Sequence, residues 1–291
     1  PRLQEKSIEK GILPSLSSSQ VEKLDPKLRL PRLPSSLIER PHLRSLLDAG
    51  LAHKLTLIAA PAGFGKTTLV RSWIASRTVP HMVSGSANQD QLSVAWVALD
   101  EGDNDPRNFW GAVLAACQTL SAHRETTTLE LLQAAQHQSM LTTFIQELSR
   151  LAARCVLVLE DYHAITSPRI HEMMASLLTR LPPTLHVILI TRVDPPLPLA
   201  RLRAYGELQE VRAADLRFAL PETQAFLQQA LPFSLDASAS ERMHIHTEGW
   251  VTGLRLLTLA LQSCKSQQES EPLLASFSGN HRYILEYLVE D

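Results

Sequence analysis

The sequence has few cysteines, no excess of charge of one sign and no long apolar run, and each absence excludes a class of protein. The three cysteines are Cys117, Cys155 and Cys264, and none of them belongs to a C-x-x-C pair. A scattered, odd set argues against a disulfide framework or a zinc site and is typical of a reducing compartment. We therefore expect a cytoplasmic protein.

The charges balance almost completely. Lys and Arg number 28 and Asp and Glu number 30, so the formal net charge is −2. A near-neutral chain has no overall field that attracts nucleic acid, so we expect any contact with DNA to lie outside these residues. No segment is apolar and long enough to span a membrane, and no apolar signal segment follows Pro1. We expect no membrane partner.

What the sequence does contain is an alternation of short apolar runs with longer segments of helical spacing. The predicted helix after Ser167-Pro168 is one example, with apolar residues three and four positions apart. Runs that are apolar throughout indicate strands buried on both faces, which is typical of an α/β fold with a doubly wound parallel sheet. Strands are predicted at residues 54–59, 94–99, 156–159, 185–190 and 207–211.

This alternation stops after residue 212, and only helices are predicted beyond it. We expect a disordered or extended lead over residues 1–25, a nucleotide-binding α/β domain over 26–212 and a small all-α domain over 213–291. The polar stretch 84–91 is predicted to be a loop. The helices after the boundary are predicted at residues 221–229, 239–246, 253–262 and 283–289.

The strongest motif is a phosphate-binding loop (Walker A) between a predicted strand and a predicted helix. It matches G-x-x-x-x-G-K-[ST], except that alanine replaces the first glycine. Glycines let successive backbone N–H groups point at phosphate oxygens, and the following helix adds its positive end. The expected nucleotide-binding residues are Ala60, Pro61, Ala62, Gly63, Phe64, Gly65, Lys66, Thr67 and Thr68.

Two side chains of this loop have distinct expected roles. Lys66 supplies a point charge to the β- and γ-phosphates, and Thr67 offers a hydroxyl to Mg²⁺. The structural alternative is a glycine-rich turn with a solvated lysine. The strand before the loop and the helix after it favour the first interpretation, with ATP or ADP and Mg²⁺ as ligands.

Two acids, Glu160 and Asp161, end the third predicted strand. In P-loop enzymes acids at such a position hold Mg²⁺ and orient water, so Glu160 is expected to be a metal ligand and both acids to be catalytic. The alternative is that they cap a turn. Arg192, at the end of the fourth strand, is expected to read the γ-phosphate, or alternatively to pair with Asp194 at the surface.

Weaker candidates follow the second and third strands. Asp100, Asp103 and Asp105 form an acidic cluster for which a solvated loop is the slightly favoured interpretation and support of Mg²⁺ or water the alternative. His163 is expected to make a local hydrogen bond rather than to act in catalysis.

With these residues in view, the chain resembles the ATP-binding module of the large LuxR-type bacterial transcription regulators. That family belongs to the signal-transducing ATPases with numerous domains (STAND). The ordered matches extend over most of the chain. They are the stretches at 60–69, 94–106, 159–163, 191–204, 213–218, 247–254 and 278–283, which include A-P-A-G-F-G-K-T-T-L and T-E-G-W-V-T-G-L.

The resemblance implies an intracellular switch in signal transduction and transcription regulation. ADP would hold a closed resting form, and ATP with an inducer would favour an open form that self-associates. Winged-helix, helical-repeat and DNA-binding parts would follow Asp291. The family usually has aspartate where this sequence has Glu160, which is one methylene longer, so we expect slow hydrolysis. The alternatives are a non-hydrolysing interaction module and a small-molecule P-loop kinase.

Overall fold

The computed structural model describes residues 26–34, 36–78, 92–118, 141–142, 144–146, 149, 154–262, 264 and 266–269. The predicted lead over 1–25, the predicted loop over 84–91 and the predicted last helix over 283–289 lie outside these residues.

Five parallel strands form one sheet in the order β2-β3-β4-β1-β5. Each predicted strand is present, and each bound differs from the prediction by no more than one residue. The predicted α/β fold with a parallel sheet is therefore confirmed. The strands are β1 (Leu55–Ala59), β2 (Ser93–Ala98), β3 (Cys155–Glu160), β4 (Leu185–Thr191) and β5 (Leu208–Arg212).

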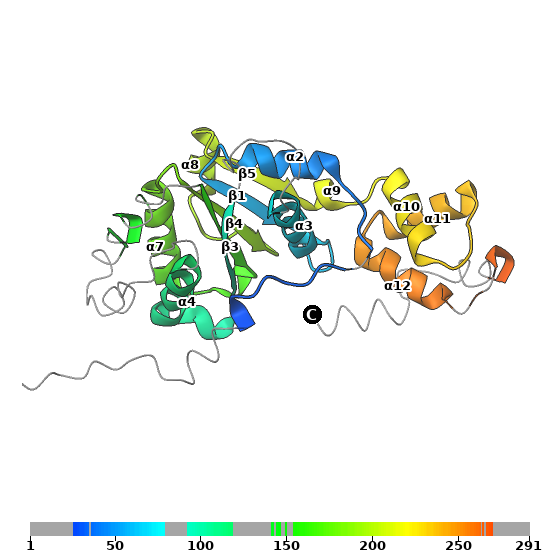
Figure 1. The fold of residues 1–291 in the computed structure, drawn as a ribbon, viewed down its shortest axis with the longest axis horizontal. Coiled ribbons are helices and arrows are strands. Elements are labelled where there is room, and N and C mark those ends of the chain that lie inside the picture. The colour runs from blue at the N-terminus through cyan, green and yellow to red at the C-terminus, as the bar shows by residue number, and fades with distance from the viewer. Residues whose placement is uncertain are drawn as a thin grey trace, which may run out of the picture.

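Helices cover both faces of this sheet (Figure 1). Successive side chains of a strand point to opposite faces, so Leu57 packs in one apolar core and Ile58 in the other. One face is covered by α2 (Pro41–Gly50), α3 (Lys66–Thr78) and α9 (Ala213–Leu216), and the other by α4 (Pro106–Gln118), α7 (Pro168–Thr179) and α8 (Leu199–Ala204). The short 3₁₀ helices are η1 (Glu101–Asn104) and η2 (Tyr162–Ala164).

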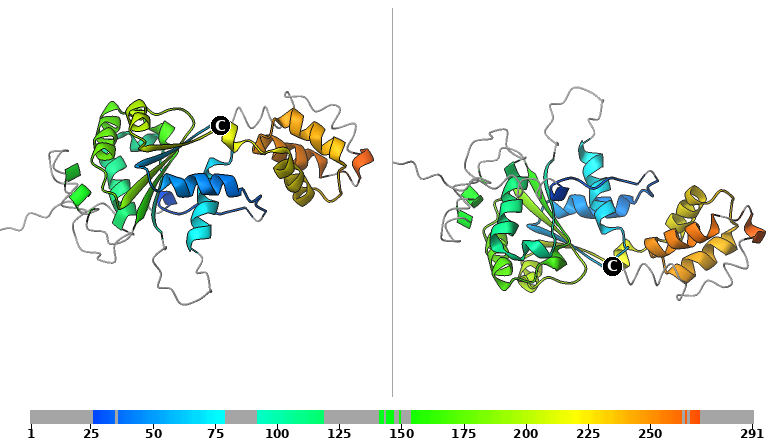
Figure 2. Two further views of the ribbon diagram at one scale, coloured as in Figure 1. Left: turned by 90° about the horizontal axis from the view of Figure 1, so that it is seen from above. Right: turned by 90° about the horizontal axis from the view of Figure 1, so that it is seen from below.

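The described residues after Arg212 contain helices and no strand. Beyond α9, which packs on the sheet, these are α10 (Leu220–Ala230), α11 (Ala237–Thr247) and α12 (Val251–Leu261), which share a third apolar core built around Met243 and Leu257. Figure 2 shows them gathered to one side of the sheet rather than over either of its faces. No described helix has the length and apolar character that spanning a membrane requires.

Local sequence signals explain where several helices begin. Asp236 caps α11 by accepting from the backbone N–H of Ala239 at 2.7 Å. Pro168 opens α7, since proline is favoured at the first position of a helix, but Ser167 makes no side-chain capping bond. The N–H of Ser167 instead donates to Oδ1 of Asn104 at 3.0 Å. The proline and this hydrogen bond to the last residue of η1 therefore define the helix start.

The strand order brings three loops to one edge of the sheet. β4 lies between β1 and β3, with Ala59 opposite Thr191 and Leu159 opposite Leu189. In a parallel sheet the carboxyl ends of the strands share one edge, and a crevice outside this edge commonly holds the ligand. The loop after β1, Arg192 after β4 and the acids at the end of β3 are therefore neighbours.

Candidate functional site

The phosphate-binding motif forms a tight loop between β1 and α3. Gly63 and Gly65 have φ angles of 72° and 75°, in the left-handed region that favours glycine. Ala60, which replaces the usual first glycine, has no positive φ, and its N–H donates to the carbonyl of Thr191 at 3.3 Å. Alanine therefore fits this position without backbone strain.

Lys66 is the first residue of α3, and its side chain folds back over the loop. Its Nζ donates to the carbonyl of Pro61 at 2.8 Å, and only 8% of the residue is exposed. A charged hydrogen bond to a phosphate oxygen is stronger than one to a neutral carbonyl. The ammonium is therefore placed where it can exchange its carbonyl partner for an anion.

Glu160 is buried at the end of β3, and both of its carboxylate oxygens accept a hydrogen bond. Thr67 donates from Oγ1 to one oxygen, Oε1, and Trp96 donates from Nε1 to the other, Oε2, at 3.0 Å. Burial raises the pKa of Glu160 and the charge of Asp161 adds to this rise, while Thr67, Trp96 and Lys66 oppose it. The carboxylate thus lies in contact with the hydroxyl expected to bind Mg²⁺.

Asp161 adopts a left-handed backbone conformation, with φ of 54° and ψ of 40°, which aspartate tolerates better than most residues. This turn gives the two neighbouring acids different environments, because half of the Asp161 side chain is exposed whereas Glu160 is buried. His163 Nδ1 lies 3.9 Å from Oδ1 of Asp161. Asp161 therefore faces the open side of the site.

Arg192 follows β4 and lines the same cavity as Lys66 and Asp161. Asp194, the surface partner that the sequence offered as the alternative, forms an ion pair with Arg212 at the end of the neighbouring strand. Arg192 thus lines the cavity from the end of β4, the strand that lies between the strand of the acids and the strand of the phosphate-binding loop.

The acids after β2 have local structural partners, and Asp103 is buried instead of lying in a solvated loop as the favoured interpretation expected. Lys27 Nζ lies 2.8 Å from Oδ2 of Asp100 and 2.7 Å from Oδ2 of Asp103. Asp103 is only 3% exposed, and its carboxylate also accepts from the N–H of Asp100 at 2.9 Å. Asp105 accepts from the N–H of Arg107. These carboxylates cap local turns instead of facing the cavity.

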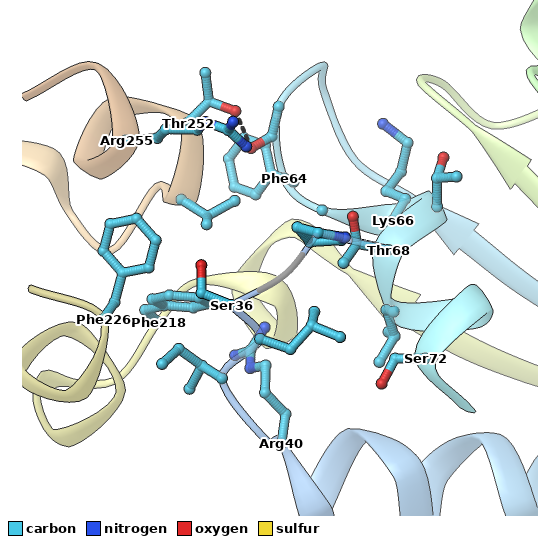
Figure 3. Close-up of a pocket in the computed structure, with 18 of the residues that line it drawn as sticks. Ser36, Arg40, Phe64, Lys66, Thr68, Ser72, Phe218, Phe226, Thr252 and Arg255 are labelled. Atoms are coloured by element: carbon cyan, nitrogen blue, oxygen red, sulfur yellow. Dashed lines mark hydrogen bonds between the residues drawn. The ribbon is translucent and has the colours of Figure 1, made fainter. Parts of the chain in front are cut away.

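A cavity of about 740 Å³ extends from the phosphate-binding loop to the helices beyond β5. Figure 3 shows Lys66 and Thr68 on the side of the loop and Phe218 and Phe226 on the side of the helices. The loop end is cationic, and the far end combines aromatic rings with the guanidinium groups of Arg40 and Arg255. Ser36, Leu37, Ile38, Val251 and Leu259 also line the cavity.

The helical part touches the phosphate-binding loop directly. Thr252, in the first turn of α12, donates to the carbonyl of Gly63 from Oγ1 at 2.9 Å and from its N–H at 3.3 Å (Figure 3). Trp250 donates from Nε1 to the carbonyl of Ala62 at 3.3 Å. A Cβ at Gly63 would lie 2.5 Å from the Thr252 hydroxyl oxygen, so the absence of a side chain at Gly63 permits this approach.

Arg40 joins the start of α2 to the beginning of the helical part. Its guanidinium donates to Glu222 at 2.9 Å, to the carbonyl of Leu216 at 2.8 Å and to that of Arg217 at 2.7 Å. It also lies over the ring of Phe218, 5.1 Å from the centroid. The segment before α2 is therefore held against the helices that form the far wall of the cavity.

Sequence reasoning did not single out Arg40 or Phe218 of the far wall, nor Trp96 and Lys27, and it offered residues 247–253, which include Trp250 and Thr252, only as a contact on the hinge side of the helical part. Phe218, Trp250 and Thr252 lie in stretches that carry the family resemblance, which was the one signal that could have singled them out. No local pattern links them to the loop, because 189 residues separate Thr252 from Gly63.

Comparisons with known proteins show the family and the fold of this chain. The family model of the AAA domain matches residues 25–159. The HTH-type transcriptional regulators MalT of Serratia proteamaculans and Yersinia enterocolitica are each 34% identical over 91% of this chain. The chain spans only 28% of the length of these relatives.

Two solved structures share the fold. A Walker-type ATPase of Pyrococcus abyssi superposes with a TM-score of 0.56 at 13% identity, over 90% of this chain and 78% of the other. A signal transduction ATPase with numerous domains and a tetratricopeptide repeat sensor, from Pyrococcus horikoshii, gives a TM-score of 0.53 at 14% identity, over 78% of this chain and 30% of the other. Together with the sequence relatives, they confirm the predicted resemblance: the chain is a P-loop ATPase module of the kind found in MalT-like transcriptional regulators.

Proposed function

We propose that this module binds ATP or ADP with Mg²⁺ and acts as a slow ATPase switch within a transcriptional regulator. The observation that carries the proposal is the cavity, because it joins a phosphate-binding loop to a separate helical part. A ligand in it would touch both. The proposed division is a nucleotide-binding part over 26–212 and a helical part over 213–291, in a protein of the cytoplasm.

The phosphates would lie on the loop. Backbone N–H groups between Gly63 and Thr68 and the amino end of α3 suit an anion. Lys66 would leave the Pro61 carbonyl for the β- and γ-phosphates, and Arg192 would approach the γ-phosphate from β4. These groups supply positive charge without any change in the sheet.

The residues around Thr67 fit Mg²⁺. A threonine hydroxyl and the Glu160 carboxylate lie in hydrogen-bonding contact, and oxygen donors of this kind are the ligands that Mg²⁺ prefers. When bound, Mg²⁺ would neutralise charge on the phosphate oxygens. Asp161, half exposed beside the cavity, would orient the attacking water.

The aromatic end of the cavity suits a base. Phe218, Phe226 and Ile38 offer apolar surface to an aromatic ring. Among the described residues that line the cavity, the only carboxylate is that of Asp161, at the phosphate end. Guanine presents adjacent N–H donors that a carboxylate would accept, so this lining favours adenine.

The ligand state would reach the rest of a regulator through the helical part. Thr252 and Trp250 bond to loop carbonyls, so a shift of the loop on phosphate binding would alter these contacts. ADP would favour the closed arrangement, and ATP would favour one that self-associates. Recognition of an inducer and of DNA would belong to further parts of such a protein.

Two measurements test the proposal against its alternatives. The nucleotide released on denaturing the purified protein should be ADP or ATP, and titration with ATP in Mg²⁺ should show saturable binding with slow release of phosphate. Binding without any phosphate release would favour a non-hydrolysing interaction module. Transfer of phosphate to a small-molecule acceptor would favour a kinase. Failure to bind either nucleotide would contradict the proposal.

A further inference from the structure

The carboxylate of Glu160 is held from two sides, and only one side belongs to the phosphate-binding loop. Oε1 accepts from the Thr67 hydroxyl, and Oε2 accepts from the indole N–H of Trp96 at 3.0 Å. Trp96 is 2% exposed and is not among the residues that line the cavity. Its polar atom therefore acts on the site only through Glu160.

The sheet register explains why this tryptophan reaches Glu160. Ala98 of β2 lies opposite Glu160 of β3, and Trp96 is two residues earlier on the same strand. Side chains two residues apart share a face, so Trp96 and Glu160 lie on the face that α3 covers. Val158 and Val70 belong to the same apolar core as the indole, and this packing fixes the ring.

The indole can affect the ionisation of the carboxylate in one direction only. An indole N–H can only donate, so it favours the ionised carboxylate and occupies one of its oxygens. Oε1 is left facing Thr67. An aspartate side chain would end about 1.5 Å, one C–C bond, closer to the strand. The longer Glu160 side chain extends from β3 to a point between the Thr67 hydroxyl and the indole.

We propose that Trp96 is a positioning residue that holds Glu160 so that a single carboxylate oxygen faces the Mg²⁺ of the bound nucleotide. This inference rests on the proposed function, because it assigns a role toward the same metal. Outer residues that orient a ligand commonly change metal affinity tenfold to a hundredfold when they are replaced.

The test compares Trp96→Phe with Trp110→Phe in the full chain, by calorimetric titration of ATP with Mg²⁺ and with EDTA. Phenylalanine keeps an aromatic ring but removes the N–H. Trp110 is also buried, and its Nε1 has no hydrogen-bond partner in the described part of the chain, so it controls for loss of indole packing. Each variant is also made in the background of Glu160→Gln.

We expect Trp96→Phe to reduce the Mg²⁺-dependent gain in ATP affinity about tenfold, with affinity in EDTA within about twofold of the parent. Trp110→Phe should match the parent in both titrations. With Glu160→Gln in place, Trp96→Phe should cause no further loss. The assignment would be refuted if Trp96→Phe left the Mg²⁺-dependent gain in ATP affinity unchanged, or if it weakened ATP binding equally with Mg²⁺ and with EDTA. The same loss of ATP affinity with and without Glu160→Gln would also refute it. A parent chain that binds no nucleotide would instead contradict the proposed function itself, and the role of Trp96 with it.

Discussion

At the scale of single residues, Lys54 and Lys66 show how position decides what a lysine does. Lys54 precedes β1, and its Nζ lies 2.8 Å from Glu207 at the amino end of the sheet. Lys66 lies at the carboxyl end, beside loop carbonyls and a cavity. Partly exposed ion pairs such as that of Lys54 contribute little to stability, so the two lysines offer a matched comparison.

Lys66→Ala should weaken ATP binding in Mg²⁺ by about tenfold or more without unfolding the chain. The lost interaction is a charged hydrogen bond to phosphate, which contributes roughly 1.5–3 kcal/mol. Calorimetric titration measures the affinity and circular dichroism checks the fold. Lys54→Ala should bind ATP like the parent. If Lys66→Ala binds ATP as tightly as Lys54→Ala does, the loop does not hold the phosphates.

His186 is a buried residue whose ionisation should affect stability. Nδ1 contacts the carbonyl oxygen of His53 and Nε2 the hydroxyl of Thr56, each at 2.9 Å. Burial lowers the pKa of His186 from 6.5 to about 4. The unfolded chain therefore binds this proton at a higher pH than the folded chain does, so stability falls as the pH drops through this interval.

Between pH 7 and pH 5 this residue should remove about 2 kcal/mol from the free energy of unfolding. His186→Gln should be less stable than the parent at neutral pH but should lose less stability on acidification. The exposed His246 is the control, since His246→Gln should keep the slope of the parent. Urea unfolding at each pH measures the difference. Parallel pH profiles for the parent and His186→Gln would contradict the expected role.

At the scale of elements, the contact between α12 and the phosphate-binding loop is the one that a switch requires. Thr252→Val removes the hydroxyl that donates to Gly63 but keeps the shape and the backbone N–H. Losing a hydrogen bond of about 1 kcal/mol should raise amide exchange in the first turn of α12 by about fivefold. Thr258→Val is the control, because Thr258 bonds within its own helix, to the carbonyl of Arg255.

Hydrogen exchange followed by mass spectrometry would resolve the two ends of α12. Faster exchange confined to the first turn in Thr252→Val is the expected result. Equal protection in Thr252→Val and the parent would mean that the hydroxyl does not hold α12 on the loop.

The sequence predicted elements and motif positions far better than it predicted contacts between distant segments. Strands and helices follow from apolar periodicity, and the glycines at 63 and 65 follow from the backbone that a phosphate loop needs. From the sequence, Trp96 could be interpreted only as a residue of an apolar strand, because its indole N–H donates to Glu160, which is 64 residues away. Lys27 and Asp103 pair across 76 residues. Such pairs depend on strand order, which local patterns do not specify.

At the scale of the whole molecule, the buried apolar residues of the described part form three separate cores. Two lie on opposite faces of the sheet and the third lies among α10, α11 and α12. The cavity opens between the sheet part and the third core, with Arg40 and Thr252 as links. A part that has its own core can move as a unit, so a ligand that contacts both sides can bias their arrangement. A ligand shifts such an equilibrium only if it interacts differently with the two arrangements.

Arg192→Ala should therefore reduce discrimination between ATP and ADP, because the γ-phosphate is the group by which these ligands differ. Arg192 ends a central strand and lines the cavity, and its planar, permanent charge suits phosphate recognition. Lys66 is less suited to this task, since it can also hold the β-phosphate of ADP. We expect the ratio of ATP to ADP affinity in Mg²⁺ to fall about tenfold, as the loss of one charged hydrogen bond implies.

Arg212→Ala is the matched control, because Arg212 ends the strand two positions away in the sheet and pairs with Asp194 outside the cavity. If the ratio is unchanged in Arg192→Ala, the γ-phosphate is read elsewhere, and the helical part with its contact at Thr252 becomes the leading alternative.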